Sequence, residues 1–415
     1  MNKRRVVVTG MGVVSPVGIG IEKFWKSLVE GKSGIGPIKH FEAGAFDCRI
    51  AGTVTDYHPE QYFTTKEARN LARFVQFASV AAREAMKQSG LDMSREDADR
   101  VGVVIGSGIG SIETIEHEYS RFLEKGPSRI TPHFIPKIII NEAAGQVSID
   151  TGARGINTCV ATACSTATNA IGDAFRFIQY DEADVMICGG TESATTVLGV
   201  GGFCALKALS TQYNDEPEKA SRPFDLNRDG FIMAEGAGVV ILEELQHAKK
   251  RGAVIFAEMV GYGRTSDAFH ITAPESTGKG AAKAMSLALK DAGLKPEDIS
   301  YINAHGTSTT LNDKVETMAV KTAFGDCAKK IPMSSTKSMT GHLLGAAGGV
   351  EFAASVLAAM NDIMPPTINY TTPDPDCDLD YIPNRARRGK VNVAMSNSLG
   401  FGGHNASVIV KKFKE

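Results

Sequence analysis

The sequence has almost no excess of charge of either sign. Its 45 basic and 47 acidic side chains leave a formal charge of -2 at pH 7. No protein-wide field therefore attracts nucleic acid or an anionic membrane, and any use of charge must be local. With 43% hydrophobic and 22% charged residues over 415 positions, the composition is that of a folded globular protein and excludes general disorder. We expect no nucleic-acid partner.

Membrane-spanning and secretory signals are also missing. No apolar run is expected to reach the roughly 18 residues of a membrane span. The first residues, Met-Asn-Lys-Arg-Arg, lead straight into Val6-Val7-Val8 without the pattern of a signal peptide. We therefore expect a cytoplasmic protein with no membrane insertion.

Cysteine pairs of the kind that form disulfides or bind metals are absent. The seven cysteines are odd in number, widely scattered and without a CxxC pair, in a chain too long to need disulfides for its stability. Each is expected to be a free thiol, either a small buried hydrophobe, an exposed bystander or a nucleophile. They are Cys48, Cys159, Cys164, Cys188, Cys204, Cys327 and Cys377.

Two apparent ligand-binding motifs are incomplete. Residues 5–16 suggest a buried strand and a glycine turn, but Ser15 replaces the third glycine of a dinucleotide fingerprint. Residues 225–230 match the first half of a calcium loop, but its twelfth position falls on Gly236 and no helix flanks it. We predict a hydrogen-bonded loop at 225–230 and no cofactor or metal in the protein.

The sequence does contain an internal repeat. A glycine-closed helix at residues 82–90 leads through an acidic linker to a strand at 101–105, and a helix at 282–293 leads in the same way to a strand at 299–303. The two closing glycines are 203 residues apart, which is close to half the chain. This pattern predicts a duplicated α/β unit.

The repeat divides the chain into two halves, residues 1–250 and 251–415. Strands at 185–188 and 238–242 are apolar on both faces, as in sheets that are covered by helices on both sides. No proline- or serine-rich linker separates the halves, so we expect one compact unit. Residues 112–140 have no counterpart in the second half and are predicted to be an insertion that carries specificity or a subunit contact.

Cys164 is the strongest candidate for a nucleophile. β-Branched residues predict a strand that ends at Ala163, and apolar residues at helical spacing follow Cys164. At a strand-to-helix junction, free N–H groups and the helix dipole stabilise a thiolate, and the small neighbours Ala163 and Ser165 leave the sulfur approachable. The alternative is a buried structural cysteine, which we expect for Cys159.

Two histidines and one aromatic residue have surroundings typical of a site. His305 follows a strand in a loop of small hydroxylic residues, and His342 opens a glycine- and alanine-rich helix whose N-terminus would keep the imidazole neutral. The alternative for each is a hydrogen-bonded structural histidine. Phe401, flanked by glycines between two strands, suits a movable gate whose backbone N–H faces an oxyanion. Its alternative is a β-hairpin with the ring in the core.

Taken together, four motifs resemble those of the β-ketoacyl-acyl-carrier-protein synthases, specifically the elongating type of fatty-acid synthesis. They are Thr162-Ala-Cys164-Ser165, the run from Asn303 to Thr309, the run from Lys337 to Gly348, and the run from Gly400 to Asn405, in the family's order. The resemblance implies a thiolase-like duplicated five-layer α/β/α/β/α fold and a homodimer. Departures from the usual family residues at Ala234, Thr310 and Asn312 remove no reacting group.

The resemblance also implies an acyltransferase that performs a decarboxylative Claisen condensation. Acyl-carrier protein would deliver an acyl group to Cys164, with the N–H groups of Cys164 and Phe401 holding the oxyanion. Malonyl-acyl-carrier protein would then lose carbon dioxide, and His305 and His342 would stabilise the enolate as N–H donors. The product expected is 3-oxoacyl-acyl-carrier protein.

Further residues receive roles by the same resemblance. Lys337 and Glu351 are expected to tune the charge and geometry around the histidines. The acyl pocket is expected to have Ile109 and Phe203 in its wall, with Phe134 reaching in from the partner subunit. A basic patch for the acidic carrier protein is expected at Lys66, Arg69, Arg129 and Lys207.

Alternatives to fatty-acid elongation stay open at this point. Two histidines favour elongation over chain initiation, and the terminal Gly-Phe-Gly-Gly lacks the second active cysteine of thiolases. A polyketide-type ketosynthase is one alternative. A non-catalytic chain-length factor or scaffold that binds carrier protein is another, although such a factor would lack the nucleophile Cys164.

Overall fold

A mixed sheet of eleven strands organises the fold. The computed structural model describes residues 3–414, and the strand order is β11-β10-β14-β15-β9-β1-β8-β7-β5-β6, with β2 paired to β1. Two small sheets, β3 with β4 and β12 with β13, lie apart from it. The strands are β1 (Val6–Ser15), β2 (Gly18–Ile19), β3 (Gly36–Pro37), β4 (Ile50–Ala51), β5 (Val101–Gly106), β6 (Asn157–Thr158), β7 (Val185–Glu192), β8 (Gly236–Glu244), β9 (Ala257–Ser266), β10 (Tyr301–Asn303), β11 (Met333–Ser334), β12 (Ile363–Met364), β13 (Arg387–Arg388), β14 (Val393–Gly400) and β15 (His404–Lys411).

Helices cover and separate the strands. The α-helices are α1 (Ile21–Glu30), α2 (Thr65–Asn70), α3 (Arg73–Ser89), α4 (Ile112–Lys125), α5 (Phe134–Ile138), α6 (Glu142–Thr151), α7 (Thr166–Gln179), α8 (Val197–Ala205), α9 (Leu245–Lys250), α10 (Lys279–Ala292), α11 (Thr310–Phe324), α12 (Lys337–Thr340) and α13 (Ala347–Asn361). The 3₁₀ helices are η1 (Pro59–Gln61), η2 (Ala98–Arg100), η3 (Pro127–Arg129), η4 (Ala163–Ser165), η5 (Pro217–Lys219), η6 (Pro296–Asp298), η7 (Gly325–Lys330) and η8 (Leu344–Ala346).

The strand order shows that the chain is built from two copies of one unit. Counted outward from the antiparallel pair β1 and β9, the order β8-β7-β5-β6 on one side matches β15-β14-β10-β11 on the other. The predicted repeat is present within this pattern, because α3, η2 and β5 correspond to α10, η6 and β10. Both α3 and α10 end at a glycine in the left-handed conformation, Gly90 and Gly293. The predicted duplicated α/β unit is confirmed.

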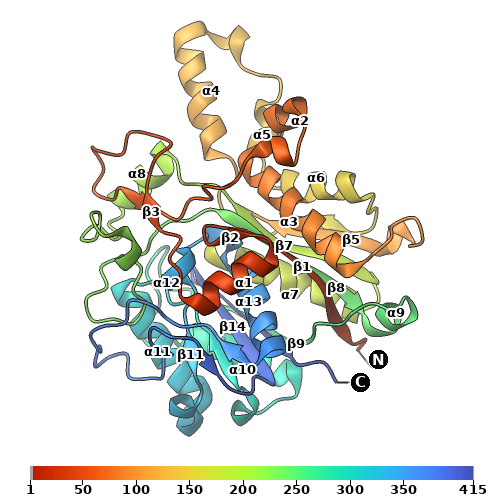
Figure 1. Ribbon diagram of the computed structural model, residues 1–415, viewed down its shortest axis with the longest axis vertical. Coiled ribbons are helices and arrows are strands. Elements are labelled where there is room, and N and C mark those ends of the chain that lie inside the picture. Colours follow the sequence, from red (N-terminus) through yellow and green to blue (C-terminus); the bar gives the residue numbers. More distant parts are fainter. Residues whose placement is uncertain (1–2, 415) are drawn as a thin grey trace.

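The two copies stack into five layers (Figure 1). The outer face of the first half is covered by α3, which packs on β1 and β8, and by α6, which packs on β5. The outer face of the second half is covered by α10, which packs on β9 and β15, and by its neighbour α11. Between the halves lie α7, on β5 and β7, and α13, which contacts both β8 and β14. This is the predicted α/β/α/β/α arrangement.

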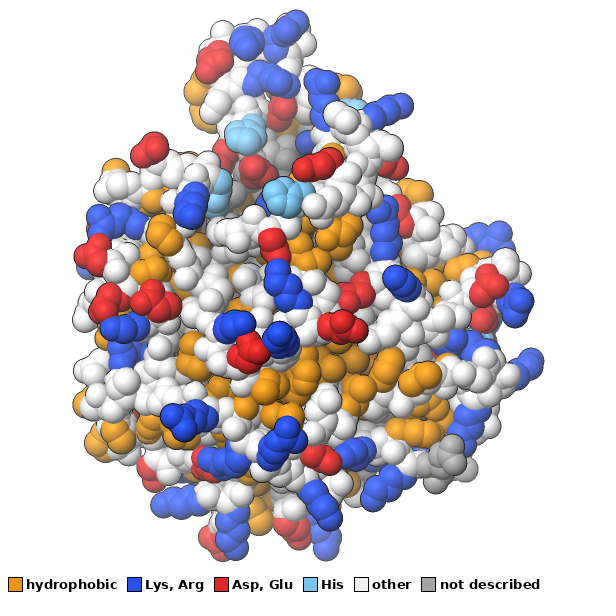
Figure 2. Space-filling view, viewed as in Figure 1, with side chains coloured by type: hydrophobic (Ala, Val, Ile, Leu, Met, Phe, Trp, Pro, Cys, Tyr) orange, Lys and Arg blue, Asp and Glu red, His pale blue; other side chains and the backbone are white. Residues whose placement is uncertain are grey.

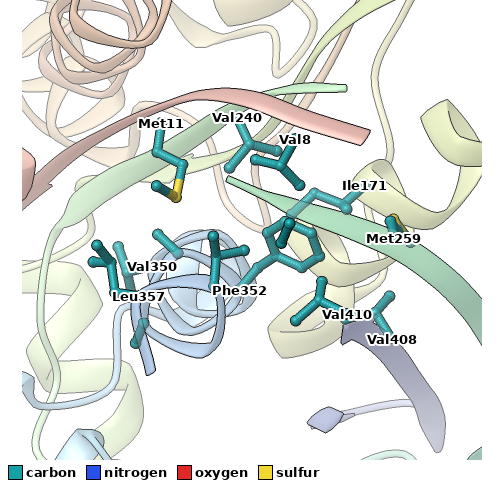
Figure 3. Close-up of a cluster of buried hydrophobic side chains, with 14 of the residues drawn as sticks. Val8, Met11, Ile171, Val240, Met259, Val350, Phe352, Leu357, Val408 and Val410 are labelled. Atoms are coloured by element: carbon teal, nitrogen blue, oxygen red, sulfur yellow. The ribbon is translucent and has the colours of Figure 1, made fainter. Parts of the chain in front are cut away.

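The largest cluster of buried hydrophobic side chains is shared by both halves. Val8 and Val240 of the first half and Val408 and Val410 of the second half belong to it, together with Phe352 of the central helix α13 (Figure 3). Burial of such side chains contributes roughly 1.5–3 kcal/mol each. The two halves therefore share one hydrophobic core.

The central helix corrects one expectation from the sequence. The segment Leu344–Asn361 has 18 residues and a mean hydropathy of 1.2, so it is long and apolar enough to cross a membrane, contrary to the prediction that no run is. However, 89% of this segment is buried inside the fold. Its hydrophobicity is explained by its position between two sheets, which leaves it no polar face.

The predicted insertion at 112–140 forms α4, η3 and α5. Figure 1 shows α4 projecting from the body of the protein. Its outer surface carries large exposed side chains, including Tyr119 (61% exposed) and Leu123 (66% exposed). On the face shown in Figure 2, basic and acidic side chains are interspersed, and basic ones gather at this projecting end.

The calcium-like segment is a hydrogen-bonded loop, as predicted. The Asp225 carboxylate is buried and accepts backbone N–H groups from Asn227 (2.9 Å), Thr371 (2.6 Å) and Thr372 (2.7 Å). Its oxygens therefore hold two loops together. In the described part of the chain, no group of three or more His, Cys, Asp or Glu side chains is placed to bind a metal ion.

Candidate active site

Cys164 lies at a tight turn that opens the central helix α7. The prediction of a strand that reaches Ala163 is wrong, because β6 ends at Thr158 and Cys164 lies in the 3₁₀ turn η4. Ala163 has a φ of 48°, a left-handed conformation that is uncommon for a residue with a side chain and marks a sharp turn. The helix prediction is confirmed, with every position of the apolar stripe buried: Ala167, Ala170, Ile171, Ala174, Phe175 and Ile178.

The structure does not support the predicted thiolate. Burial raises the pKa of the Cys164 thiol to about 11, although the Lys337 charge and the Phe401 backbone N–H lower it. Desolvation is the largest cause of this shift, since a buried charge loses its water, and it favours the protonated thiol over the thiolate.

The two histidines come together from different parts of the second half. His305 follows β10, and His342 lies between α12 and η8. Their rings meet edge to face, with centroids 5.3 Å apart and planes at 87°. Burial, followed by the Lys337 charge, holds the pKa of both imidazoles well below the usual 6.5. Both causes favour the neutral form of the His342 imidazole that the sequence analysis expected.

Lys337 determines which nitrogen of His305 carries the proton. Its Nζ donates to the His305 carbonyl oxygen at 2.7 Å, lies 3.3 Å from His305 Nδ1 and forms a buried ion pair with Glu351. Because an ammonium group can only donate, Nδ1 acts as the acceptor and the proton of neutral His305 is on Nε2. Burial raises the pKa of Glu351 to about 7, with Lys337 opposing the shift.

Two buried glutamates at the site were missed by the sequence analysis. Glu316 on α11 accepts the backbone N–H groups of His305 and Gly306, each at 2.8 Å. Burial raises the pKa of Glu316 to about 7. Glu192, the last residue of β7, is fully buried beside Cys164. The only sequence signal was a carboxylate next to an apolar strand or motif loop, which is common elsewhere in the chain.

Phe401 lies in the turn of the predicted hairpin between β14 and β15. Its ring is half-buried and lies 6.4 Å from the ring of Phe203, so it lines a cavity rather than filling the core. Because Gly400 has no side chain, its backbone packs closely against the turn that contains Cys164. A Cβ at Gly400 would lie 2.8 Å from the Thr162 carbonyl oxygen and 3.1 Å from the Cys164 nitrogen, closer than a side chain tolerates.

A cavity of about 460 Å³ joins these groups. Cys164, His305, His342 and Phe401 all line it, and of the cysteines in residues 3–414 only Cys164 does. The predicted pocket residues Ile109 and Phe203 also line it. Phe134, on α5, does not line the cavity of its own chain, so its role from a partner subunit stays a prediction.

The predicted basic patch falls on two parts of the surface. Lys66 and Arg69 are exposed on α2, and Lys137 of α5 donates to the Arg69 carbonyl oxygen at 3.0 Å, which places α2 beside the insertion. Arg129 is exposed in η3, within the insertion. Lys207 follows α8 and borders the cavity itself.

Comparisons with known proteins agree in both sequence and fold. Residues 3–248 match the family model "Beta-ketoacyl synthase, N-terminal domain", and residues 256–371 match "Beta-ketoacyl synthase, C-terminal domain". The chain is 52% identical to the 3-oxoacyl-[acyl-carrier-protein] synthase 2 of Synechocystis sp. over 414 residues, covering 100% of this chain and 99% of that protein. It is 52% identical to the protein of the same name from Coxiella burnetii over 412 residues, covering 99% of both.

Solved structures give the same result. A type II polyketide ketosynthase, solved in complex with its acyl-carrier protein and bound to the hexaketide, is similar with a TM-score of 0.93 and 38% identity, over 99% of this chain and 100% of that one. A beta-ketoacyl synthase from Burkholderia phymatum has a TM-score of 0.91 and 35% identity over the same shares.

Proposed function

The chain belongs to the beta-ketoacyl synthase family, and on that premise we propose that Cys164, His305 and His342 carry out the two half-reactions of its condensation. The protein is an acyltransferase-class ketosynthase that performs the elongating condensation of fatty-acid synthesis. The observation that carries the assignment of residues is the cavity in which one thiol faces two neutral imidazoles. The identity of 52% to two proteins named 3-oxoacyl-[acyl-carrier-protein] synthase 2, against 38% to the polyketide ketosynthase, favours the fatty-acid reaction over the polyketide alternative.

The first half-reaction moves an acyl group from carrier protein to Cys164. The sulfur attacks the thioester carbonyl, the new carbon–sulfur bond forms, and the bond to the carrier thiol breaks. The proton of the Cys164 thiol ends on the leaving sulfur, so no further reactant is needed. Backbone N–H groups of Cys164 and Phe401 are proposed to hold the oxyanion, since the Phe401 N–H lowers the pKa of the Cys164 thiol and so lies near the sulfur.

The second half-reaction forms the carbon–carbon bond. The malonyl carboxylate leaves as carbon dioxide, and its bonding electrons form an enolate on the remaining thioester. His305 and His342 donate N–H groups to the enolate oxygen, for which the Nε2 proton of neutral His305 is suited. The enolate carbon bonds to the acyl carbon, the bond to Cys164 breaks, and the released thiolate takes up one proton from the solvent, which balances the negative charge of the malonyl carboxylate.

One experiment tests this function against a non-catalytic carrier-binding role. The protein is incubated with carrier protein bearing a radioactive acyl group, and the label is traced to a peptide after denaturation. Malonyl-carrier protein is then added and the 3-oxoacyl product is measured. Label on the Cys164 peptide followed by product formation supports the proposal, whereas binding of carrier protein without label or product contradicts it.

We also propose acyl-carrier protein and a second copy of this chain as partners in the cytoplasm. The ketosynthase in a similar structure is in complex with its acyl-carrier protein. The exposed apolar side chains of α4 and the short edge strand β6 support a self-association surface next to the insertion. The halves 1–250 and 251–415 would then contribute the nucleophile and the histidines, respectively, to one site in each subunit.

Charge reversal on α2 is expected to weaken carrier-protein binding. Lys66→Glu or Arg69→Glu replaces an exposed cation that faces an acidic partner, so the KM for carrier-bound substrate should rise roughly fivefold at low salt and by less at high salt. Reaction with a small thioester should be unchanged. The matched control is Lys290→Glu, the same charge reversal at an exposed lysine of α10. An unchanged KM at low salt would show that Lys66 and Arg69 do not contribute to carrier-protein binding.

A larger side chain in the wall of the acyl pocket is expected to restrict the enzyme to shorter acyl chains. Ile109 is half-buried and lines the cavity, and close-packed walls adjust little to added volume. Ile109→Phe should therefore keep the elongation of short primers and reduce that of long primers about tenfold or more. Rates across a primer series are measured beside a melting curve. A uniform loss with a lowered Tm would show that Ile109 is ordinary core.

A further inference from the structure

Glu192 connects the wall of the acyl pocket to the loop that follows His342. Building on the proposed function, we propose that Glu192 is a positioning residue that determines chain-length specificity. It does so by fixing the position of the loop that contains Ile109 relative to the loop that follows His342. Glu192 is the last residue of β7, has no exposed surface and lines the catalytic cavity. No step of the condensation described above uses it.

Four hydrogen bonds make this connection. One carboxylate oxygen accepts the Ser107 hydroxyl at 2.8 Å and the Ile109 N–H at 3.2 Å. The other oxygen accepts the Gly108 N–H at 2.9 Å and the Gly345 N–H at 3.0 Å. Three donors belong to the loop after β5, and the fourth lies three residues beyond His342. A single rigid group thus fixes the distance between two loops that belong to different halves of the chain.

The packing leaves this connection no room to shift. A Cβ at Gly345 would lie 2.5 Å from the Gly108 nitrogen and 2.6 Å from the Glu192 carboxylate. A Cβ at Gly108 would lie 2.8 Å from the same carboxylate. The two loops are therefore in backbone contact around Glu192, so a change in its length or acceptors moves Ile109 relative to His342.

Only a carboxylate satisfies all four donors. Each of its oxygens has two acceptor positions, whereas glutamine would present an NH₂ group to N–H donors and leave buried groups unpaired. Aspartate keeps the charge but is one methylene shorter and cannot reach both loops in the same geometry. The two substitutions therefore distinguish the effect of the carboxylate charge from the effect of side-chain length.

The charge of Glu192 supplies a second readout that a purely structural residue would lack. Burial is the main cause of the raised pKa of the Cys164 thiol, and the charges of Glu192 and Glu351 add to it while Lys337 opposes it. Burial raises the pKa of Glu192 itself, while its four hydrogen bonds stabilise the carboxylate and oppose that shift. Removing the carboxylate charge lowers the pKa of the Cys164 thiol. The thiolate fraction at a given pH then increases, by a factor of ten for each full pKa unit.

The experiment compares Glu192→Gln, Glu192→Asp and the matched control Glu84→Gln. Glu84 is half-buried, whereas Glu192 is fully buried, but it likewise joins two segments, because it accepts the backbone N–H groups of Val13 (3.0 Å) and Ile21 (2.7 Å), and it does not line the cavity. For each variant, condensation rates are measured over a series of acyl primers, and alkylation of Cys164 by iodoacetamide is measured against pH. Melting curves accompany both measurements.

The expected results differ between the variants. Both Glu192 variants should lose discrimination between the preferred primer and longer primers by roughly fivefold, with a lower kcat. Only Glu192→Gln should be alkylated faster at the same pH, by about threefold to tenfold, and Glu192→Asp should follow the wild-type pH profile. Glu84→Gln should match the wild type in primer ratio and alkylation.

Two outcomes would overturn the proposal. In the first, folded Glu192 variants keep the wild-type primer ratio and alkylation profile. In the second, Glu84→Gln changes the primer ratio as much as they do, so that the effect reflects general loosening. Wild-type protein that forms no 3-oxoacyl product would instead contradict the proposed function. If Glu192→Gln does not fold, the primer ratio of Glu192→Asp decides the question.

Discussion

The Cys164→Ala variant is expected to take up no acyl label and to form no 3-oxoacyl product, a loss of about a thousandfold or more. Cys164 is the only cysteine of the described chain that lines the catalytic cavity, and it lies in the turn η4 that opens α7. Removing a sulfur atom from a small buried side chain leaves the surrounding packing nearly unchanged. The measurement is attachment of radioactive acyl groups from carrier protein, followed by turnover with malonyl-carrier protein.

Cys159→Ala is the matched control. The Cys159 thiol donates to the Ile140 carbonyl oxygen at 3.4 Å, outside the cavity lining, and burial raises its pKa as well. This variant should keep wild-type acylation and turnover. Acyl label that still attaches to Cys164→Ala at the wild-type rate would show that the nucleophile is another group.

Replacing His305 or His342 by alanine is expected to separate the two half-reactions. Both imidazoles are neutral, and their proposed role begins when malonyl decarboxylation places charge on the enolate oxygen. Loss of one N–H donor at such an oxyanion costs about a hundredfold to a thousandfold in rate. Decarboxylation of malonyl-carrier protein should fall by that amount, while acylation of Cys164 should keep much of its rate.

The protonated state of Cys164 makes this result informative. If a histidine must first remove the thiol proton, acylation and decarboxylation should fall by equal factors, which would contradict the enolate role and indicate a general base. His58→Ala, at an exposed histidine away from the cavity lining, should change neither half-reaction. Burst kinetics of acylation and release of carbon dioxide measure the two steps independently.

The sequence predicted those parts of the fold that leave a local pattern. Helix α7 followed from an apolar stripe, the hairpin at Phe401 from glycines between two strands, and the repeat from two glycine-closed helices. The helix and the hairpin each depend on residues a few positions apart, and the repeat depends on two such local patterns that match each other. The four motifs did the same for the candidate site, because each is one short continuous stretch of sequence.

Features that depend on residues far apart in sequence were missed. The Cys164 thiol was expected to be ionised because a helix follows it, yet burial between two sheets dominates, and no local pattern measures burial of that depth. Glu192 and Gly345 are 153 residues apart, so nothing near either one indicates their hydrogen bond. The prediction of a strand up to Ala163 was wrong for the same reason. The chain leaves the sheet after Thr158, and the turn that contains Cys164 packs against Gly400, which is far away in sequence.

Duplication gives the repeated strands, turns and helices of this protein an equivalent in the other half, and the position equivalent to the nucleophile Cys164 is Gly345. The turns η4 and η8 each precede a central helix, and each begins with a residue of nearly equal left-handed φ, 48° at Ala163 and 50° at Leu344. Strand ends correspond as well, so Glu192 at the end of β7 is equivalent to Gly400 at the end of β14. In one half, Gly400 places no side chain beside the Cys164 N–H; in the other, the Glu192 carboxylate accepts the Gly345 N–H at 3.0 Å. The proposed oxyanion site at Cys164 thus has an equivalent turn in the other half, where the protein's own carboxylate occupies the position of the anion.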